Sequence, residues 1–196
     1  MRQGFFRTIL AVLGISAGLS APAAALDFCE DAWLTRNLII DRYGYCFNST
    51  LGQALFDNSD CSTSQPNLSA EDAELVGFIR GGEEQVGCSI NTGAGPSAAM
   101  REAHAFYNSL QDIPATDHLG WACWGYRGAP IPVRSGASDT APVIGTLQPG
   151  QGMVSGYWPR GPFIFATIVT GPSGSTLARG WMRAQISDAD CDQVAG

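Results

Sequence analysis

Six cysteines are distributed over the chain, and no two of them stand in a C-x-x-C pair. An even number of cysteines in an exported chain favours disulfide bonds over metal ligation. Only two histidines, His104 and His118, are available to complete a metal site with them. We therefore expect three disulfides, no metal ion and no other cofactor. The cysteines are Cys29, Cys46, Cys61, Cys88, Cys123 and Cys191.

The first 25 residues have the order of segments that a secretory signal peptide requires. Two arginines precede an apolar run over residues 9–19, and three alanines at 23–25 supply the small side chains ahead of a cut before Leu26. The run is shorter than the roughly 20 residues that cross a membrane. We expect residues 1–25 to be a signal peptide, the protein to be periplasmic or secreted, and no membrane insertion after cleavage.

All eleven basic residues are arginine, and the chain contains no lysine. This excludes a catalytic or Schiff-base lysine and the lysine of a phosphate-binding loop. Without residues 1–25, which carry two arginines and no acid, nine basic side chains face 18 acidic ones. An acidic surface repels nucleic acid and anionic lipid, so we expect no nucleic-acid partner.

Four segments before residue 112 have helical patterns. In the first, Trp33, Asn37 and Ile40 recur at three- and four-residue spacing. Ser69 precedes the third and can cap it, and the double glycine at 81–82 is expected to end or break it. The expected helices cover residues 30–42, 50–56, 70 to about 80, and 97–110. Residues 89–97 have the Gly-, Ser- and Asn-rich composition of a linker.

From Trp121 onward, short apolar runs alternate with glycine and proline. Regularly spaced short strands with turn residues between them indicate a small barrel or sandwich. The run 163–169 is expected to be a buried central strand. We place the boundary between helical and β parts near residues 112–120. The apolar runs are Ile131–Val133, Val143–Leu147, Phe163–Val169 and Gly180–Met182.

Helix length constrains the pairing of the cysteines. A helix over residues 30–42 is roughly 18 Å long, whereas the Cα atoms of a disulfide lie within about 7 Å of each other. Cys29 and Cys46, at its two ends, are therefore not expected to pair. If each of the next two helices reverses direction, Cys61 returns to Cys29, and Cys88 returns to Cys46. The expected bonds are Cys29–Cys61, Cys46–Cys88 and Cys123–Cys191.

Residues 33–56 carry a motif at the end of the first expected helix. Its characteristic residues are Arg42, Gly44, Tyr45 and Phe47. The stretch resembles a YARHG domain, an extracellular bacterial module, although Ile40-Asp41 stand where the family has Tyr-Ala and Tyr43 stands where it has His. The resemblance implies a fold and an extracytoplasmic setting, and no chemistry comes with it.

Three landmarks follow one another in the second half: residues 133–138, 142–150 and 180–182. Their order resembles that of bacterial SH3-like domains, which commonly bind cell-wall peptide or serve as accessory modules. Pro132 replaces the usual Asn, and the segment 158–179 is longer than is typical. The resemblance implies a barrel of five or six strands whose first and last strands are neighbours, which supports the Cys123–Cys191 bond.

Together these features predict an α+β fold, in which a small disulfide-linked helical domain precedes an SH3-like β-barrel. The expected division is a signal peptide at 1–25, a YARHG-like helical domain at 26–88, a linker with a helix at 89–117, and a bacterial SH3-like β domain at 118–196.

Aromatic residues gather in the β part, and an exposed subset beside arginine would suit peptide or glycan stacking. No catalytic residue is expected, since oxidised cysteines cannot be nucleophiles and no Gly-x-Ser-x-Gly elbow occurs. The residues expected to bind ligand are Trp124, Arg134, Tyr157 and Trp158.

The sequence thus favours a non-catalytic exported binding protein of the bacterial envelope, which recognises cell-wall peptide or a periplasmic protein partner. Two alternatives stay open. One is a small cell-wall hydrolase, which would require His118 or a carboxylate pair in a cleft. The other is an exported enzyme inhibitor or stress protein.

Overall fold

The computed structural model describes residues 26–196, apart from the side chain of His118. The predicted signal peptide, residues 1–25, lies outside the described residues. Helices occupy the first half and strands the second, as expected for an α+β chain. The elements are α1 (Phe28–Asp41), α2 (Thr50–Leu55), α3 (Ala70–Val86), α4 (Ala98–Asn108), β1 (Thr116–Trp124), β2 (Ile131–Arg134), β3 (Val143–Leu147), β4 (Gly152–Tyr157), β5 (Phe163–Val169), β6 (Thr176–Arg183), the 3-10 helix η1 (Asp188–Asp190) and β7 (Gln193–Ala195).

Each of the four α-helices begins at a residue that suits an N-cap. The caps are Asp27, Ser49, Ser69 and Ser97, and each side chain accepts a hydrogen bond from the backbone N–H three residues on. This satisfies one of the free N–H groups of every first turn. The start of the third helix at the Ser69 cap is thereby confirmed.

The predicted end of this helix at Gly81-Gly82 is wrong, because α3 continues to Val86 and is closed by Gly87 in the left-handed conformation, with φ +74°. The reason is close packing. A Cβ atom at Gly82 would lie 3.1 Å from Cζ of Phe28, so the glycine gives α1 room against α3. Here glycine marks a helix contact and not a helix end.

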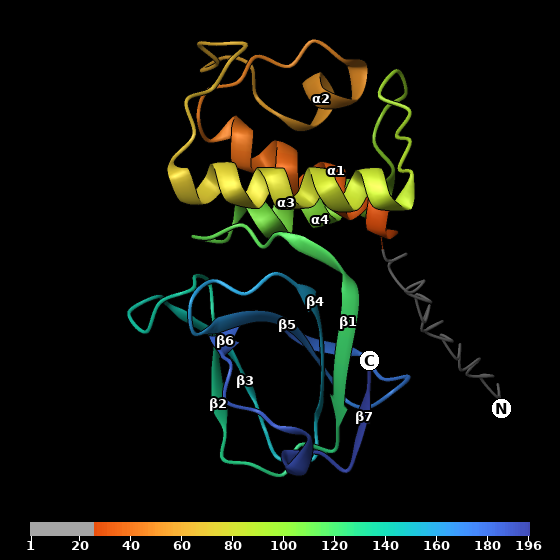
Figure 1. Cartoon of the computed structure of the whole chain (residues 1–196), viewed down its shortest axis with the longest axis vertical. Helices are drawn as coiled ribbons and strands as arrows, with labels where there is room; N and C mark the ends of the chain where they lie inside the picture. Colours follow the sequence, from red (N-terminus) through yellow and green to blue (C-terminus); the bar gives the residue numbers. More distant parts are fainter. Residues whose placement is uncertain (1–25) are drawn as a thin grey trace, which may run out of the picture.

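The strands form one antiparallel sheet of seven strands in the order β3-β2-β6-β5-β4-β1-β7. The expected strands at 143–147 and 163–169 are present with the same bounds, and β5 is largely buried between β4 and β6. The closed barrel that the SH3 resemblance implies is not found, because β3 and β7 remain as two unpaired edges. Figure 1 shows the helices stacked across one end of this sheet.

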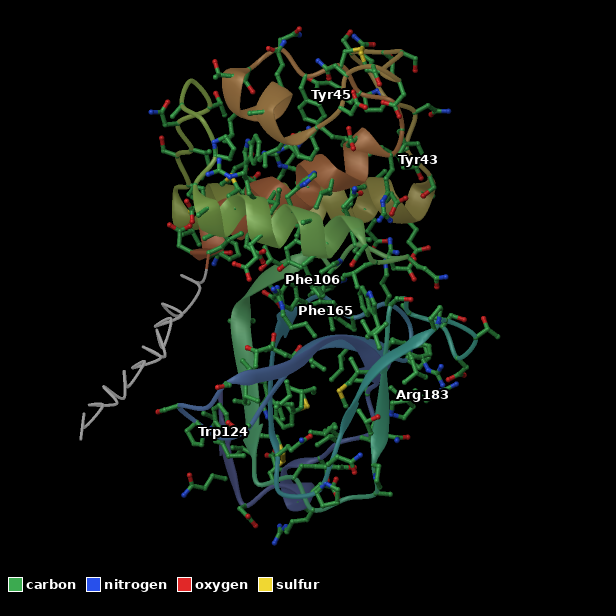
Figure 2. All side chains as sticks on the ribbon, turned by 180° about the vertical axis from the view of Figure 1, so that it is seen from behind. Tyr43, Tyr45, Phe106, Trp124, Phe165 and Arg183 are labelled. Carbon is green, nitrogen blue, oxygen red and sulfur yellow. A yellow bond between two sulfur atoms is a disulfide. The ribbon has the colours of Figure 1, made fainter. Side chains whose placement is uncertain are left out.

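Helices and sheet share one hydrophobic core at the seam between them. Buried residues of α1, α3 and α4 form a single cluster with Phe163, Phe165 and Trp181 of the sheet, and Figure 2 places Phe106 of α4 beside Phe165 of β5 at this seam. The segment predicted as a linker with a helix contributes Met100, Ala103 and Tyr107 to the same core. A second hydrophobic cluster consists of buried residues of the β part alone.

Two of the three predicted disulfides are wrong: the structure pairs Cys29 with Cys88 and Cys46 with Cys61, in place of Cys29–Cys61 and Cys46–Cys88. The six-residue helix α2 is too short to return the chain along α1. The backbone instead stays beside the end of α1, where the Cys46 N–H donates to the Thr63 carbonyl. The long helix α3 makes the return, and it brings Cys88 to the start of α1.

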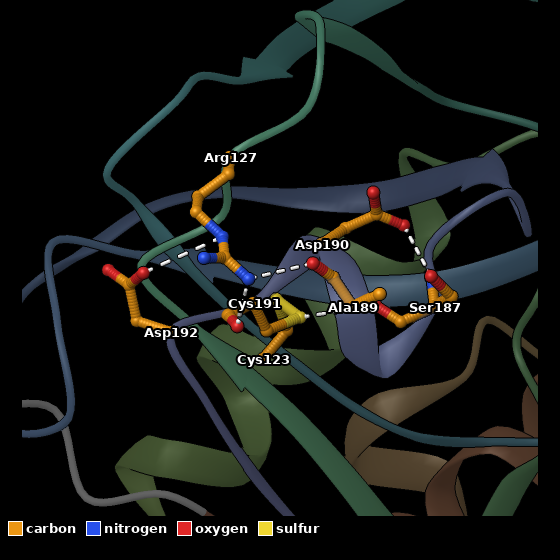
Figure 3. Close-up of a disulfide and its surroundings, with 7 residues drawn as sticks. All are labelled: Cys123, Arg127, Ser187, Ala189, Asp190, Cys191 and Asp192. Atoms are coloured by element: carbon orange, nitrogen blue, oxygen red, sulfur yellow. Dashed lines mark hydrogen bonds and ion pairs between the residues drawn. A yellow bond between two sulfur atoms is a disulfide. The ribbon is translucent and has the colours of Figure 1, made fainter.

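The third predicted bond, Cys123–Cys191, is present. It holds the C-terminal segment against β1, where Cys123 faces Val194 in the register between β1 and β7. Figure 3 shows Arg127 reinforcing this junction: its Nη2 donates to the carbonyls of Ala189 and Cys191, at 2.7 and 2.9 Å. The N- and C-terminal strands of the sheet are therefore neighbours, as expected.

The motif after α1 fastens the helices to the sheet. Arg42 donates from Nη1 to the Gln111 carbonyl at 2.8 Å and from Nη2 to the Leu110 carbonyl at 2.7 Å. Gly44 has φ +73°, and a Cβ atom there would lie 2.7 Å from Oγ of Ser62. The fold therefore requires both residues. Arg42 binds the segment that leads into β1, and Gly44 makes the turn that follows α1.

Candidate functional site

A cavity of about 410 Å³ lies at the seam, between α1 and α4 on the helical side and β4, β5 and β6 on the sheet side. This volume falls within the range of small-molecule sites, roughly 300–1,000 Å³. The helices supply small and acidic side chains and the Tyr107 phenol to its wall, whereas the sheet supplies further hydroxyls and one guanidinium. Its lining residues are Leu26, Asp31, Ala99, Glu102, Ala103, Tyr107, Tyr157, Thr167, Thr176 and Arg179.

A chain of hydrogen bonds crosses the cavity wall from helix to sheet. Tyr107 of α4 donates from Oη to Oδ1 of Asp31 at 2.7 Å, and its oxygen accepts from Nη2 of Arg179 at 2.9 Å. Oη of Tyr157 lies 2.8 Å from the same oxygen. Because the hydroxyl proton of Tyr107 is used on Asp31, Tyr157 supplies the proton of this last bond.

Aromatic rings hold Arg179 in place as well. Its guanidinium carbon lies 4.4 Å from the ring centre of Phe106 and 5.1 Å from that of Tyr107. Stacking on ring faces fixes the plane of a guanidinium and leaves its edge free to donate hydrogen bonds. Tyr157 is held by a ring as well: it meets Phe165 edge to face, with ring centres 4.8 Å apart.

Burial sets the protonation states of this cluster. It raises the pKa of Asp31, and hydrogen bonds from Tyr107 and Thr116 partly offset the rise. Burial also raises the pKa of both phenols, with the Asp31 charge adding to the effect, so Tyr107 and Tyr157 remain donors. Burial lowers the pKa of Arg179, but the two phenols and Asp31 outweigh it and the pKa is raised. Arg179 therefore keeps its charge.

Of the four residues predicted to bind ligand, Tyr157 lies in the cavity wall. Trp158 follows it on the chain and has 39 % of its surface exposed. Its ring packs on Phe78 of α3 with centres 4.0 Å apart, and its backbone N–H donates to the Ala115 carbonyl at 2.7 Å. Trp158 thus contacts the helices at the seam, outside the cavity.

The other two predicted residues lie elsewhere. Trp124 ends β1 and packs over Gly152, whereas Tyr157 pairs with Thr116 at the opposite end of β1. Nine residues of strand separate these ends by roughly 25 Å, and Figure 2 shows Trp124 well away from the seam. Arg134, on β2, donates to the Ala141 carbonyl at 2.8 Å. The four residues therefore do not form one groove.

The cavity also contains residues that the sequence patterns did not single out as ligand-binding. Asp31 fits the acidic first turn of a helix, and Arg179 fits the polar side of a hairpin strand. Tyr107 lies in the expected helix 97–110, where an aromatic residue fits the apolar face. The one available signal was chemical: an arginine stands directly before the apolar run Gly180–Met182, which the structure shows to be buried.

Of the two histidines, the structure describes the side chain of His104 alone, which lines a second cavity together with Asp41, Asp57 and Asp60. His104 meets Phe56 edge to face, with ring centres 5.3 Å apart, and burial lowers its pKa. His118 belongs to β1, and its side chain lies outside the described part of the chain. Within residues 26–196 no group of three or more His, Cys, Asp or Glu side chains is placed to hold a metal ion.

Fold and cavity define a disulfide-linked α+β protein in which a helical layer covers one end of an open antiparallel sheet. The YARHG domain matches residues 9–84, which confirms the resemblance of the first half. Residues 87–196 match the domain of unknown function DUF4453 and not an SH3 family. Since this match covers more than half of the chain, the protein belongs to the DUF4453 family.

No curated protein matches the chain, and no solved structure does. YARHG is an extracellular type of domain, and three disulfides with no free cysteine are typical of an oxidising compartment. Among residues 26–196, none of the helices has the length and apolar content of a membrane span.

Proposed function

We propose that this protein is a non-catalytic binding protein of the bacterial envelope, exported by its signal peptide to the periplasm or beyond, and that it holds cell-wall peptide in the cavity at the seam. The observation that carries the proposal is a preformed cavity of about 410 Å³ in which a stacked arginine stands beside two phenols. Pockets of this kind orient a ligand by a few fixed polar groups.

The rigidity of the site supports binding. Asp31, Tyr107 and Tyr157 are fixed to one another by hydrogen bonds, and Arg179 is fixed to them. Side chains that are already ordered lose little conformational entropy when a ligand binds. Outside the cavity, Arg160 joins the helical layer to the sheet, because it extends from the segment after β4 to acids of α3.

The likeness to bacterial SH3-like domains belongs to this proposal as well. Its three landmarks fall on β2, β3 and β6, which are consecutive in the sheet. In such domains the sheet serves as an accessory or peptide-binding module. In this chain the helical layer would add the second wall of the site, in place of an exposed aromatic groove.

The first test is co-sedimentation of the oxidised protein with purified peptidoglycan, with a pull-down from envelope extract run in parallel. We expect the protein to sediment with peptidoglycan and soluble stem peptides to release it. The control variant is Trp124→Leu, at the far end of the sheet, which should sediment like the unaltered protein.

Two results would contradict the proposal. If neither peptidoglycan nor its soluble stem peptides bind, the cavity does not serve cell-wall peptide. If the protein releases new soluble fragments from peptidoglycan, it is an enzyme. Recovery of one envelope protein in place of peptidoglycan would support the protein-partner alternative.

A further inference from the structure

Arg179 differs from two other partly buried arginines, Arg36 and Arg160, in what neutralises its charge. Among the described residues, Arg36 pairs directly with Glu83, and Arg160 pairs with Asp72 and Asp112. No carboxylate lies within 4.0 Å of Arg179 in this part of the chain. Its polar neighbours are the hydroxyls of Tyr107 and Tyr157.

A carboxylate of the cavity wall is linked to Arg179 through one hydroxyl. Asp31 is 8 % exposed and is bridged to Arg179 by the Tyr107 hydroxyl, which donates to the carboxylate and accepts from the guanidinium. A buried charge is stable when it is paired and hydrogen-bonded. The guanidinium is therefore positioned and charged, but it has room for a direct anionic partner, and a cavity adjoins it.

We propose that the cavity binds the free carboxylate of a short peptide and that Arg179 pairs with it directly. This inference rests on the proposed function and specifies which chemical group of the peptide the site recognises. The planar fork of a guanidinium matches the two oxygens of a carboxylate. Of its five N–H donors, one on Nη2 serves the Tyr107 hydroxyl, and a bidentate pair with a carboxylate takes two of the others.

The remaining lining residues favour a peptide carboxylate over other anions. Thr167 and Thr176 carry hydroxyls on the sheet side of the cavity, where they can form hydrogen bonds with peptide amides. Ala99 and Ala103, on the helical side, have small side chains that take up little of its space. Glu102 and Asp31 add negative charge to the same cavity. A dianion such as phosphate meets more repulsion there than a monoanionic carboxylate does.

The test compares stem peptides released from peptidoglycan with the same peptides after their carboxylates have been converted to amides. Titration calorimetry on the oxidised protein measures both dissociation constants. We expect the acids to bind roughly tenfold more tightly than the amides, because a charge-assisted bidentate pair is lost on amidation. Inorganic phosphate, at equal concentration, should not displace the acids.

Variants assign the effect to Arg179. Arg179→Gln should reduce the ratio between acid and amide binding to about one, and Arg179→Lys should keep only part of it because lysine lacks the fork. Arg134→Gln is the matched control, since Arg134 is a partly buried arginine of the same sheet outside the cavity. It should leave the ratio unchanged. Near-UV circular dichroism verifies that each variant folds.

Equal binding of acids and amides by the unaltered protein would overturn the inference even if Arg179→Gln fails to fold, and the proposed function would then stand alone. Displacement by phosphate would also overturn it. If neither form of the stem peptides binds, the proposed function fails, and the inference fails with it. Tyr157→Phe, which removes one hydroxyl beside Arg179, gives an independent check and should lower the ratio.

Discussion

Arg160 and Asp72 join the two halves of the chain: Nη2 of the arginine, which follows β4, lies 2.7 Å from Oδ1 of the aspartate in the first turn of α3. The same guanidinium donates from Nη1 to Asp112 at 2.9 Å. Asp72 in turn accepts a hydrogen bond of 2.6 Å from the Tyr43 hydroxyl. One arginine thus fixes sheet, helix and connecting segment around the seam.

Replacing Arg160 should therefore destabilise the whole fold. Arg160→Met removes the charge of a side chain that is 13 % exposed, and Asp72 and Asp112 lose the cation with which they pair. Removing one partner of a buried pair costs about 3–5 kcal/mol, but both aspartates retain some exposure and can be rehydrated, so we expect a loss of about 2 kcal/mol. Urea unfolding followed by tryptophan fluorescence measures it.

Arg183→Met provides the control for this prediction. Arg183 pairs with Asp139 at the surface, where 47 % and 55 % of the two side chains are exposed. Exposed pairs of this kind contribute little to stability. A loss with Arg183→Met as large as with Arg160→Met would show that position in the seam is not what makes Arg160 important.

Asp41 should make the protein less stable as the pH rises. Burial raises its pKa to about 6, and the negative charges of Asp60 and Asp57 add to the effect. An unfolded aspartate ionises near pH 3.9. Between these values the folded protein holds a proton that the unfolded chain has lost, so this residue's contribution to stability falls from about pH 4 to pH 6 and is constant above.

Asp41→Asn removes this dependence. We expect the variant to gain about 1 kcal/mol over the unaltered protein at pH 7.5, since Asp41 is partly exposed and solvent screens the repulsion, and to show little gain at pH 4. Urea midpoints at several pH values measure the difference. Asp31, whose pKa is also raised, is present in both proteins and cancels. A gain of the same size at pH 4 would rule out the proton as its cause.

Local chemistry made much of the fold predictable. Ser69 and Ser97 are followed by apolar periodicity, and both begin helices. The runs 143–147 and 163–169 are rich in β-branched and aromatic residues, and both are strands. β1 and β4 contain Gly120 and the Ser155-Gly156 pair, which weaken a strand pattern, and their pairing in the sheet outweighs that weakness.

The cavity was not predictable in the same way. Asp31 satisfies the dipole of α1 and Tyr107 satisfies a helical pattern, so neither shows a local conflict that would mark it as functional. Only the packing of α1 and α4 against β6 brings them to Arg179. The two disulfides were predicted wrongly for the same reason. The direction of the chain after α1 depends on which later helix packs along α1, and local sequence does not show this.

The disulfide pairing can be tested by its effect on stability. Cys29–Cys88 closes a loop of 59 residues and Cys46–Cys61 one of 15. Chain entropy assigns about 4 kcal/mol to the longer loop and about 3 kcal/mol to the shorter. The double variant Cys29→Ala/Cys88→Ala should therefore lose more stability in urea than Cys46→Ala/Cys61→Ala. Peptide mapping without reduction that linked Cys29 to Cys61 would refute this pairing directly.

Two adjacent glycines of α3 offer the sharpest test of the helix packing. A Cβ atom at Gly81 meets nothing within 4 Å, whereas one at Gly82 lies 3.1 Å from Phe28. Alanine inside a helix is more stable than glycine by about 1 kcal/mol. Gly81→Ala should therefore stabilise the protein by about that amount, and Gly82→Ala should gain less or lose stability, because the methyl group presses on the ring. Equal gains in urea unfolding would mean that α1 and α3 are not in close contact at this point. The further variant Phe28→Leu, combined with Gly82→Ala, should restore part of the missing gain if the ring is what the methyl group meets.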